Sequence, residues 1–148
     1  MDYSPAYIMS KYFIDEGLLD DPTGSSPDWP VYVGALPDGN LTDNDAVGCL
    51  DTTPVKDGRV MEDGDNIFHH GIQLILRSLA YNTGYAKIDE LKENLETVNR
   101  DTVTVDGDTF RLDNVTLSTG IVTLGQEDEG SKRRELFTLN FLVTLKEI

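Results

Sequence analysis

The alternation of apolar and polar positions is clearest from Ile67 to Leu79, where both faces of a predicted strand carry apolar residues. Such a strand is typical of the centre of a sheet. At Asn82–Gly84 the period changes from two to three or four, and Asn82 or Thr83 is expected to cap a helix. The apolar stripe of this helix consists of Tyr85, Ile88, Leu91, Leu95 and Val98. Strand and helix together form the predicted scaffold of the domain.

A second helix is predicted over Ser4–Glu16, because Ser4 can cap it, Pro5 suits its first turn, and apolar residues recur at helical spacing. The Pro- and Asp-rich stretch Asp20–Pro30 is expected to be a loop. Two short strands follow in the prediction, over Val31–Leu36 and Ala46–Leu50. The second contains Cys49, the only cysteine, which is expected to be a small buried residue.

Two segments rich in glycine and charge are predicted as loops. Asp51–Asn66 contains several Asp/Gly turn signals and is expected to be a long excursion beyond the sheet. Gly125–Lys132 is expected to be an exposed charged loop. A loop as long as Asp51–Asn66 in a small domain is usually functional or disordered.

The remaining C-terminal part is predicted as strands. Thr102–Val105 and Asp108–Asp113 flank an Asp-Gly pair and form a hairpin. Further strands are predicted over Val115–Leu124 and over Arg133–Glu147, where strict alternation indicates a half-buried strand. The result is an α+β fold: a mixed, mostly antiparallel sheet of about seven strands with both helices packed on one face.

Length and charge change this picture in two ways. The 148 residues fit a single domain, 1–148, and two helices leave the other sheet face or the sheet edges for another subunit to cover. The net charge of −15 disfavours general binding to nucleic acid. This negative charge either keeps the protein soluble or forms a surface that must lie near DNA without adhering to it. We find neither a membrane span nor a secretory signal in the sequence, so we expect synthesis in a cytoplasm.

The residues indicate no catalytic chemistry, no cofactor and no metal site. His69 and His70 point to opposite faces of a strand, so one is expected to be packed and the other exposed. Asp43–Asp45 and Asp63–Asp65 allow a calcium hypothesis, but neither continues into the calcium-binding loop pattern. The basic run Lys132–Arg134 could contact phosphate, although an ion pair within the chain or between subunits is favoured because acidic residues precede it.

Several short motifs follow one another along most of the chain. They are W-P-V-Y-V-G at Trp29–Gly34, Asp51-Thr52 ahead of K-D-G-R-V-M at Lys56–Met61, H-G-I-Q at His70–Gln73, N-T-G-Y-A-K at Asn82–Lys87, T-V-D-G-D-T-F-R at Thr104–Arg111, L-G-Q-E at Leu124–Glu127 and R-R-E-L-F-T-L-N at Arg133–Asn140. As an ordered set they resemble the tail terminator family of long-tailed bacteriophages, often called minor capsid proteins. One departure is His70, where the family tends to have proline.

This resemblance implies a structural protein of the phage particle and no catalysis. Such a protein forms a homohexameric ring at the head-proximal end of the tail, in the virion neck, after assembly in the host cytoplasm. Its partners are copies of itself, the tail tube protein and the head-completion or stopper protein. Viral DNA passes through the ring without specific binding, and the acidic charge predicts an acidic channel.

Candidate contact residues then lie in the two predicted loops and beside them. They are Asp51, Thr52, Asp57, Gly58, Arg59, Met61, Gln126, Glu127, Lys132, Arg133, Arg134 and Glu135. The alternative within phage assembly is a head-completion or neck adaptor protein, which is also a small ring former. A calcium- or carbohydrate-binding β module is the alternative from another class, and an enzyme is the least supported one.

Overall fold

The computed structural model describes residues 3–24, 27–34, 36, 45–60, 66–129 and 132–148. For residues 56–60, 66, 67, 127–129, 132 and 133 it describes the backbone alone. The elements, in order, are α1 (Pro5–Asp15), β1 (Val31–Val33), β2 (Ala46–Val60), β3 (Asn66–Ser78), α2 (Tyr81–Glu96), β4 (Asp101–Val105), β5 (Asp108–Leu117), β6 (Val122–Glu129) and β7 (Lys132–Glu147).

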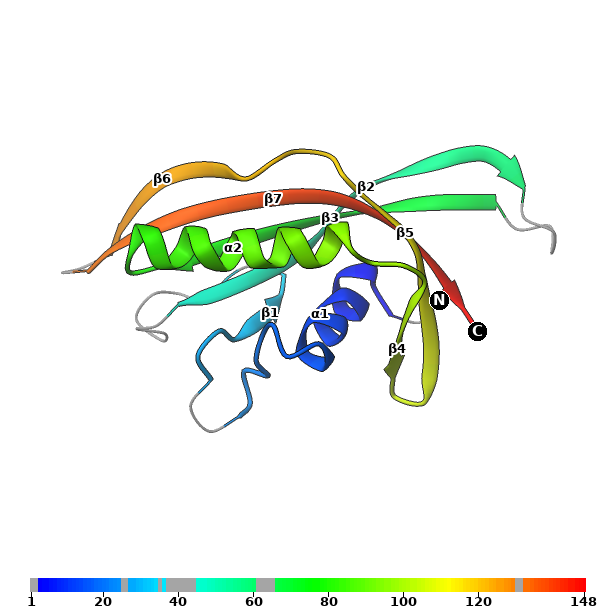
Figure 1. The fold of residues 1–148 in the computed structure, drawn as a ribbon, viewed down its shortest axis with the longest axis horizontal. Coiled ribbons are helices and arrows are strands. Elements are labelled where there is room, and N and C mark those ends of the chain that lie inside the picture. The colour runs from blue at the N-terminus through cyan, green and yellow to red at the C-terminus, as the bar shows by residue number, and fades with distance from the viewer. Residues whose placement is uncertain (1–2, 25–26, 35, 37–44, 61–65, 130–131) are drawn as a thin grey trace.

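The strands form one curled sheet in the order β1-β2-β3-β7-β5-β4, with β6 pairing with β7 (Figure 1). Among the described strands, β1 and β2 pair in parallel and the other pairs are antiparallel. β3 lies in the middle between β2 and β7, as its apolar residues on both faces predicted. The predicted α+β class, with a mixed and mostly antiparallel sheet, is confirmed.

Both helices pack on the same face of this sheet, and the core lies between them and the strands (Figure 1). The register places Cys49 opposite Leu74, and Leu74 opposite Leu139, so these three side chains point to the same face. All three are fully buried, together with Phe137 and Leu91. The full burial of Cys49 confirms its prediction as a small core residue, and this burial raises the pKa of its thiol.

The N-terminal helix follows its local sequence signals and is tied to the sheet by polar contacts. Ser4 is its N-cap, and the Ser4 side chain accepts a hydrogen bond from the Tyr7 N–H at 3.2 Å. The Ala6 N–H donates to Asp51 Oδ1 at 2.9 Å, and the Cys49 thiol donates to the Ala6 carbonyl at 3.4 Å. These contacts fasten the start of α1 to β2.

The prediction that Asn82 or Thr83 caps the second helix is wrong. The N-cap of α2 is Ala80, without a side-chain hydrogen bond, and the helix begins at Tyr81. The Ser78 hydroxyl instead organises the turn, since it accepts the Ala80 N–H at 3.3 Å and donates to the Ala80 carbonyl at 3.0 Å. Gly84 therefore lies inside the first turns of α2, where the helix approaches the sheet.

The two predicted loops are also wrong, because most of their residues extend long strands. β2 continues through Asp51 to Val60, and β3 begins at Asn66. β6 and β7 likewise fill most of the segment predicted as a charged loop. The Asp57-Gly58 signal falls in the register shift between Lys56 and Val60, and a second shift, between Thr52 and Val55, brackets Thr53-Pro54. The signal at Asp63–Asp65 lies outside the described residues. Backbone hydrogen bonds to a neighbouring strand thus outweigh the local turn preference.

A single strand over Val115–Leu124 was a further wrong prediction. β5 ends at Leu117 and β6 starts at Val122, and both pair with the same edge of β7, one behind the other. In the gap, the N–H groups of Ser118 and Thr119 both donate to the Asn140 carbonyl, at 2.9 and 3.3 Å. The apolar pattern alone does not reveal this break.

Tyr12 joins three elements through its buried hydroxyl. The hydroxyl oxygen lies 3.2 Å from Asn94 Oδ1 on α2 and 3.1 Å from Asp101 Oδ2 on β4. Burial raises the pKa of Tyr12, and the Asp101 carboxylate adds to this effect. The phenol therefore stays protonated when ordinary tyrosines ionise, and this contribution to stability is lost as the pH rises above about 10.

We expect Tyr12→Phe to lower the free energy of unfolding by about 1–2 kcal/mol, because it removes a buried hydroxyl donor and keeps the ring. Urea unfolding followed by circular dichroism measures the change. The matched control is Tyr85→Phe, at a half-exposed ring, which should stay within about 0.5 kcal/mol of the parent protein. Equal losses in the two variants would contradict the role given to the Tyr12 hydroxyl.

Candidate functional site

A two-stranded arm formed by β2 and β3 extends from one end of the molecule (Figure 1). β1 pairs with β2 only as far as Cys49, and β7 pairs with β3 only as far as His70. Beyond these points each of the two strands has only the other as a partner among the described strands. An isolated hairpin of this kind is marginally stable in water, so the arm is suited to packing on another chain.

The first group of predicted contact residues lies along this arm. Asp51 and Thr52 lie at its base, where Asp51 also holds the Ala6 N–H and Thr52 lies opposite Gly71. Asp57, Gly58 and Arg59 follow within the second register shift of β2. Met61 lies outside the described residues. The described members of this group therefore lie along one projecting element.

The β6–β7 hairpin forms the opposite end of the sheet (Figure 1) and carries the second group. The Gln126 amide donates to Glu135 Oε1 at 2.8 Å. In the backbone register, three acidic positions are paired with three basic ones, as Glu127–Arg134, Asp128–Arg133 and Glu129–Lys132. Opposite charges at paired positions stabilise antiparallel strands, and this favours the ion-pair hypothesis for the basic run. Arg134 is only 1% exposed, so it is held within its own chain.

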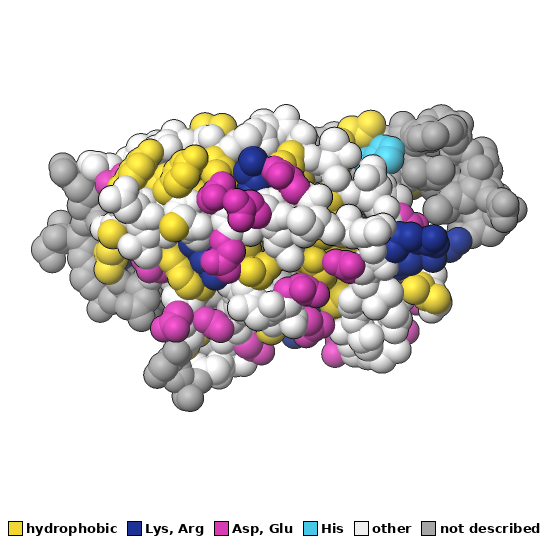
Figure 2. All heavy atoms as spheres, in the orientation of Figure 1, with side chains coloured by type: hydrophobic (Ala, Val, Ile, Leu, Met, Phe, Trp, Pro, Cys, Tyr) yellow, Lys and Arg dark blue, Asp and Glu magenta, His cyan; other side chains and the backbone are white. Residues whose placement is uncertain are grey.

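Large apolar side chains are also exposed near this hairpin. They are Leu79, Tyr81 and Tyr85 at the start of α2, and Val122 and Leu124 on β6. Figure 2 shows apolar side chains gathered over the N-terminal end of α2 and β6, while acidic side chains are spread over the middle of the same view. Exposed apolar clusters bordered by polar residues commonly mark protein interfaces.

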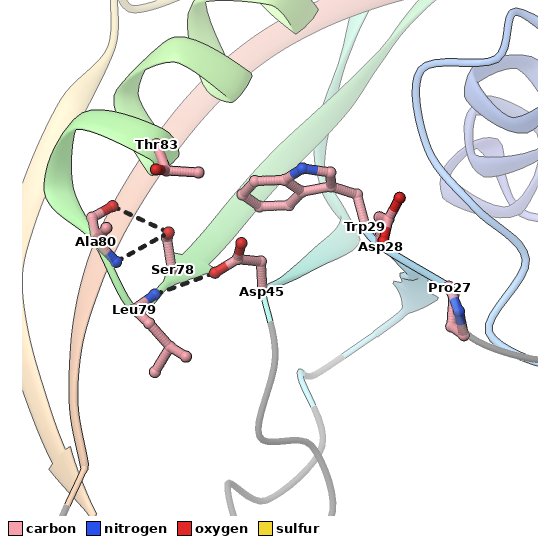
Figure 3. Close-up of a pocket in the computed structure, with 8 residues that line it drawn as sticks. All are labelled: Pro27, Asp28, Trp29, Asp45, Ser78, Leu79, Ala80 and Thr83. Atoms are coloured by element: carbon pink, nitrogen blue, oxygen red, sulfur yellow. Dashed lines mark hydrogen bonds between the residues drawn. The ribbon is translucent and has the colours of Figure 1, made fainter.

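A pocket of about 480 Å³ lies beside the start of α2 and is lined by Pro27, Asp28, Trp29, Asp45, Ser78, Leu79, Ala80 and Thr83 (Figure 3). The Asp45 carboxylate accepts the Leu79 N–H at 3.1 Å. The indole ring of Trp29 extends toward Thr83, with the Asp45 carboxylate on the same side of the pocket. This pocket was not predicted from the sequence, although a lone tryptophan in a Pro- and Asp-rich loop was a usable signal.

The histidines do not follow the expected division into one packed and one exposed ring. Both are half-buried. His69 Nδ1 lies 2.8 Å from the Thr144 hydroxyl, whereas His70 lines a pocket of about 160 Å³ with Pro5, Asp51 and Pro54. Burial lowers the pKa of His70, against an opposing effect of Asp51. Among the described residues, no three His, Cys, Asp or Glu side chains are grouped so that they could hold a metal ion.

Comparison with known families shows what kind of protein this architecture belongs to. The family model described as bacteriophage tail terminator protein matches residues 12–147. The chain belongs to the bacteriophage tail terminator family. This confirms the resemblance found in the motifs. The chain matches none of the curated proteins with which it was compared.

Family membership gives this tail terminator a structural role in the phage particle. No helix in the described part of the chain is both long enough and apolar enough to cross a membrane.

Proposed function

We propose that this tail terminator forms a homohexameric ring at the head-proximal end of the phage tail, where it stops growth of the tail tube. The ring would lie in the neck of the virion and join the tail to the head-completion or stopper protein, after assembly in the host cytoplasm. The observation that carries the proposal is the pair of unlike hairpins at opposite ends of one curved sheet (Figure 1) in a member of this family.

Unlike ends favour a ring over a symmetric dimer. A two-fold dimer uses the same patch on both subunits, whereas head-to-tail contacts join two different patches and close into a ring when the rotation allows. Here the outer edges of the β2–β3 arm have no partner strand in the described part of the chain, and the other end has an apolar cluster beside β6. Strand edges that are left open are covered by other chains or protected against them.

We assign the contacts with the tail tube protein and the stopper protein to residues at the same two ends of the sheet. Asp51–Met61 and Gln126–Glu135 contain all the candidate contact residues named from the sequence. One end of a ring-shaped terminator faces the tail tube protein and the other faces the head-completion protein. We place these two stretches at those faces or at the subunit boundaries beside them.

The charge of the chain supports a channel through which DNA slides. With a net charge of −15, a ring of this protein repels the phosphate backbone unless its basic residues are concentrated on the lining. We infer that viral DNA passes without specific binding. An image of the ring in which mostly Lys and Arg side chains line the channel would contradict this inference.

Phage that lack this protein are expected to assemble tails longer than normal, because nothing ends polymerisation of the tube. Negative-stain images of the mutant particles measure tail length, and particles complemented with the wild-type gene are the control. Tails of normal length on heads that leak DNA would instead indicate a stopper or neck adaptor. Normal tails on intact heads, together with a protein that stays monomeric at high concentration, would reject the proposal.

A further inference from the structure

The outer face of α2 carries its charges against the polarity of the helix. The first eight residues of α2 contain no acid, whereas the last eight contain one base, Lys92, and four acids: Asp89, Glu90, Glu93 and Glu96. Backbone dipoles leave partial negative charge at the C-terminal end of a helix, so the two glutamates in the last turn lower its stability. The next base, Arg100, lies beyond the helix and is followed directly by Asp101. Arrangements that cost stability in this way are typical of surfaces with another purpose.

Two of these four carboxylates are paired within the helix and two are not. Glu90 and Glu96 form ion pairs with lysines on α2. In the described part of the chain, Asp89 and Glu93 take part in no salt bridge. Hydrogen bonding to Glu96 raises the pKa of Lys92, and the two other carboxylates beside it add to this effect. The second half of this face therefore has a net negative charge that attracts cations.

The same face begins with an exposed aromatic pair. One stripe of the helix, with its members four residues apart, contains Tyr81, Tyr85, Asp89 and Glu93. The two tyrosine rings are stacked at 6.5 Å, and each is nearly half exposed. Both rest on the buried ring of Phe137, which holds them in place. Figure 2 shows apolar side chains over the N-terminal end of α2 and acidic side chains over the middle of the same view.

A face with aromatic rings at one end and carboxylates at the other fits a segment of matching polarity. Rigid aromatic rings provide apolar contact at low entropic cost, and carboxylates bind ammonium and guanidinium groups. A second copy of this chain matches the face poorly, because it brings a further net charge of −15. We propose that the outer face of α2 binds a segment of another virion protein whose apolar residues contact the two tyrosines and whose lysine or arginine residues contact Asp89 and Glu93. The inference rests on the proposed function and names the chemistry of one partner.

A synthetic peptide tests both the charge and the polarity of this face. The probe is a fluorescein-labelled peptide of about 12 residues, roughly 18 Å long as a helix, with leucine and alanine in one half and arginine and alanine in the other. Fluorescence anisotropy should show saturable binding with a Kd below about 100 μM. The matched peptide has the same composition with leucine and arginine interspersed, and it should bind about fivefold more weakly.

Neutral variants show whether the carboxylates of α2 are responsible. Asp89→Asn/Glu93→Gln keeps the size of both side chains and should weaken binding of the probe about fivefold. The charge control is Asp106→Asn/Glu147→Gln, which removes the same charge at two exposed positions outside α2. This control should bind the probe within about twofold of the parent protein, because its acids lie away from the proposed contact.

Glu93→Lys separates binding from folding, because we expect it to change the two in opposite directions. The new lysine lies four residues after Asp89 and three after Glu90, and it suits the C-terminal end of the helix, so the Tm should rise by about 1–4 °C. The same variant should bind the probe about tenfold more weakly. Tyr81→Ser/Tyr85→Ser should also weaken binding about fivefold, and circular dichroism confirms that it is folded.

Three results would overturn the assignment: equal binding of the two peptides, equal binding by the Asp89→Asn/Glu93→Gln variant and its charge control, or no binding up to about 1 mM. Self-association of the wild-type protein that Tyr81→Ser/Tyr85→Ser abolishes in sedimentation would assign the face to a second copy and also overturn it. The tail-length experiment tests the terminator role by itself. Normal tails without the protein would reject that role, whereas overlong tails together with any of these peptide results would reject only the docking face.

Discussion

Phe137→Ala is expected to lower the free energy of unfolding by about 3–5 kcal/mol, the largest effect of any single substitution considered for this protein. Phe137 is fully buried on β7 beneath the start of α2. Its ring centre lies 5.2 Å from that of Tyr81 and 6.3 Å from that of Tyr85. Truncation loses the transfer free energy of the ring and leaves a cavity that the helix and the paired strands cannot fill.

Urea unfolding followed by circular dichroism measures this loss. The control is Val122→Ala on β6. Val122 pairs with Thr138, the residue after Phe137 on β7, but the Val122 side chain is 43% exposed. It should cost less than about 1 kcal/mol, because little apolar area leaves the interior. A loss below about 1.5 kcal/mol for Phe137→Ala would mean that α2 is not held to the sheet by this ring.

Gly84→Val is expected to cost about 1–3 kcal/mol, because α2 approaches the sheet too closely for a side chain at this position. A Cβ atom on Gly84 would lie 2.7 Å from Phe137 Cε2 and 2.8 Å from Ser78 Cβ. Both neighbours are buried and belong to central strands, so relief requires the helix to move away from its strongest packing contact. Overpacking of this kind is expected to outweigh the gain from removing a helical glycine.

The matched control is Ala86→Val, two residues along the same helix at an exposed position. It isolates the cost of a β-branched side chain in a helix, about 0.5 kcal/mol. The difference between the two variants in urea unfolding is then the cost of the close approach. If Gly84→Val proved no worse than Ala86→Val, the contact of α2 with β3 and β7 would be looser than described.

The long apolar patterns predicted their elements well because each depends on the local sequence alone. The alternation in β7 identifies its buried face. Of the predicted α2 stripe, Ile88, Leu91 and Leu95 are buried, whereas Tyr85 is 45% exposed and Val98 lies beyond the helix, which ends at Glu96. The Asp106-Gly107 turn also follows local chemistry. Both residues have positive φ, 49° and 91°, as a two-residue hairpin turn requires.

The two stretches named as contact sites were expected to be loops, but their described residues are paired strands at the two ends of the sheet. Their contacts with other chains stay a prediction. Turn-forming residues were interpreted as loops because a short stretch of sequence does not reveal which distant strand it pairs with. The Trp29 pocket was missed for the same reason, since Trp29, Asp45 and Thr83 meet only through the fold.

The sequence by itself determined the family, the α+β class, the two helices, the central strand β3 and the buried character of Cys49. These depend on side-chain periodicity, caps and motifs that act over a few neighbouring residues. Only the tertiary structure decided how far β2 and β6 extend, where α2 begins, and that Arg134 is buried. The physical reason is that strand pairing and burial depend on partners distant in the chain.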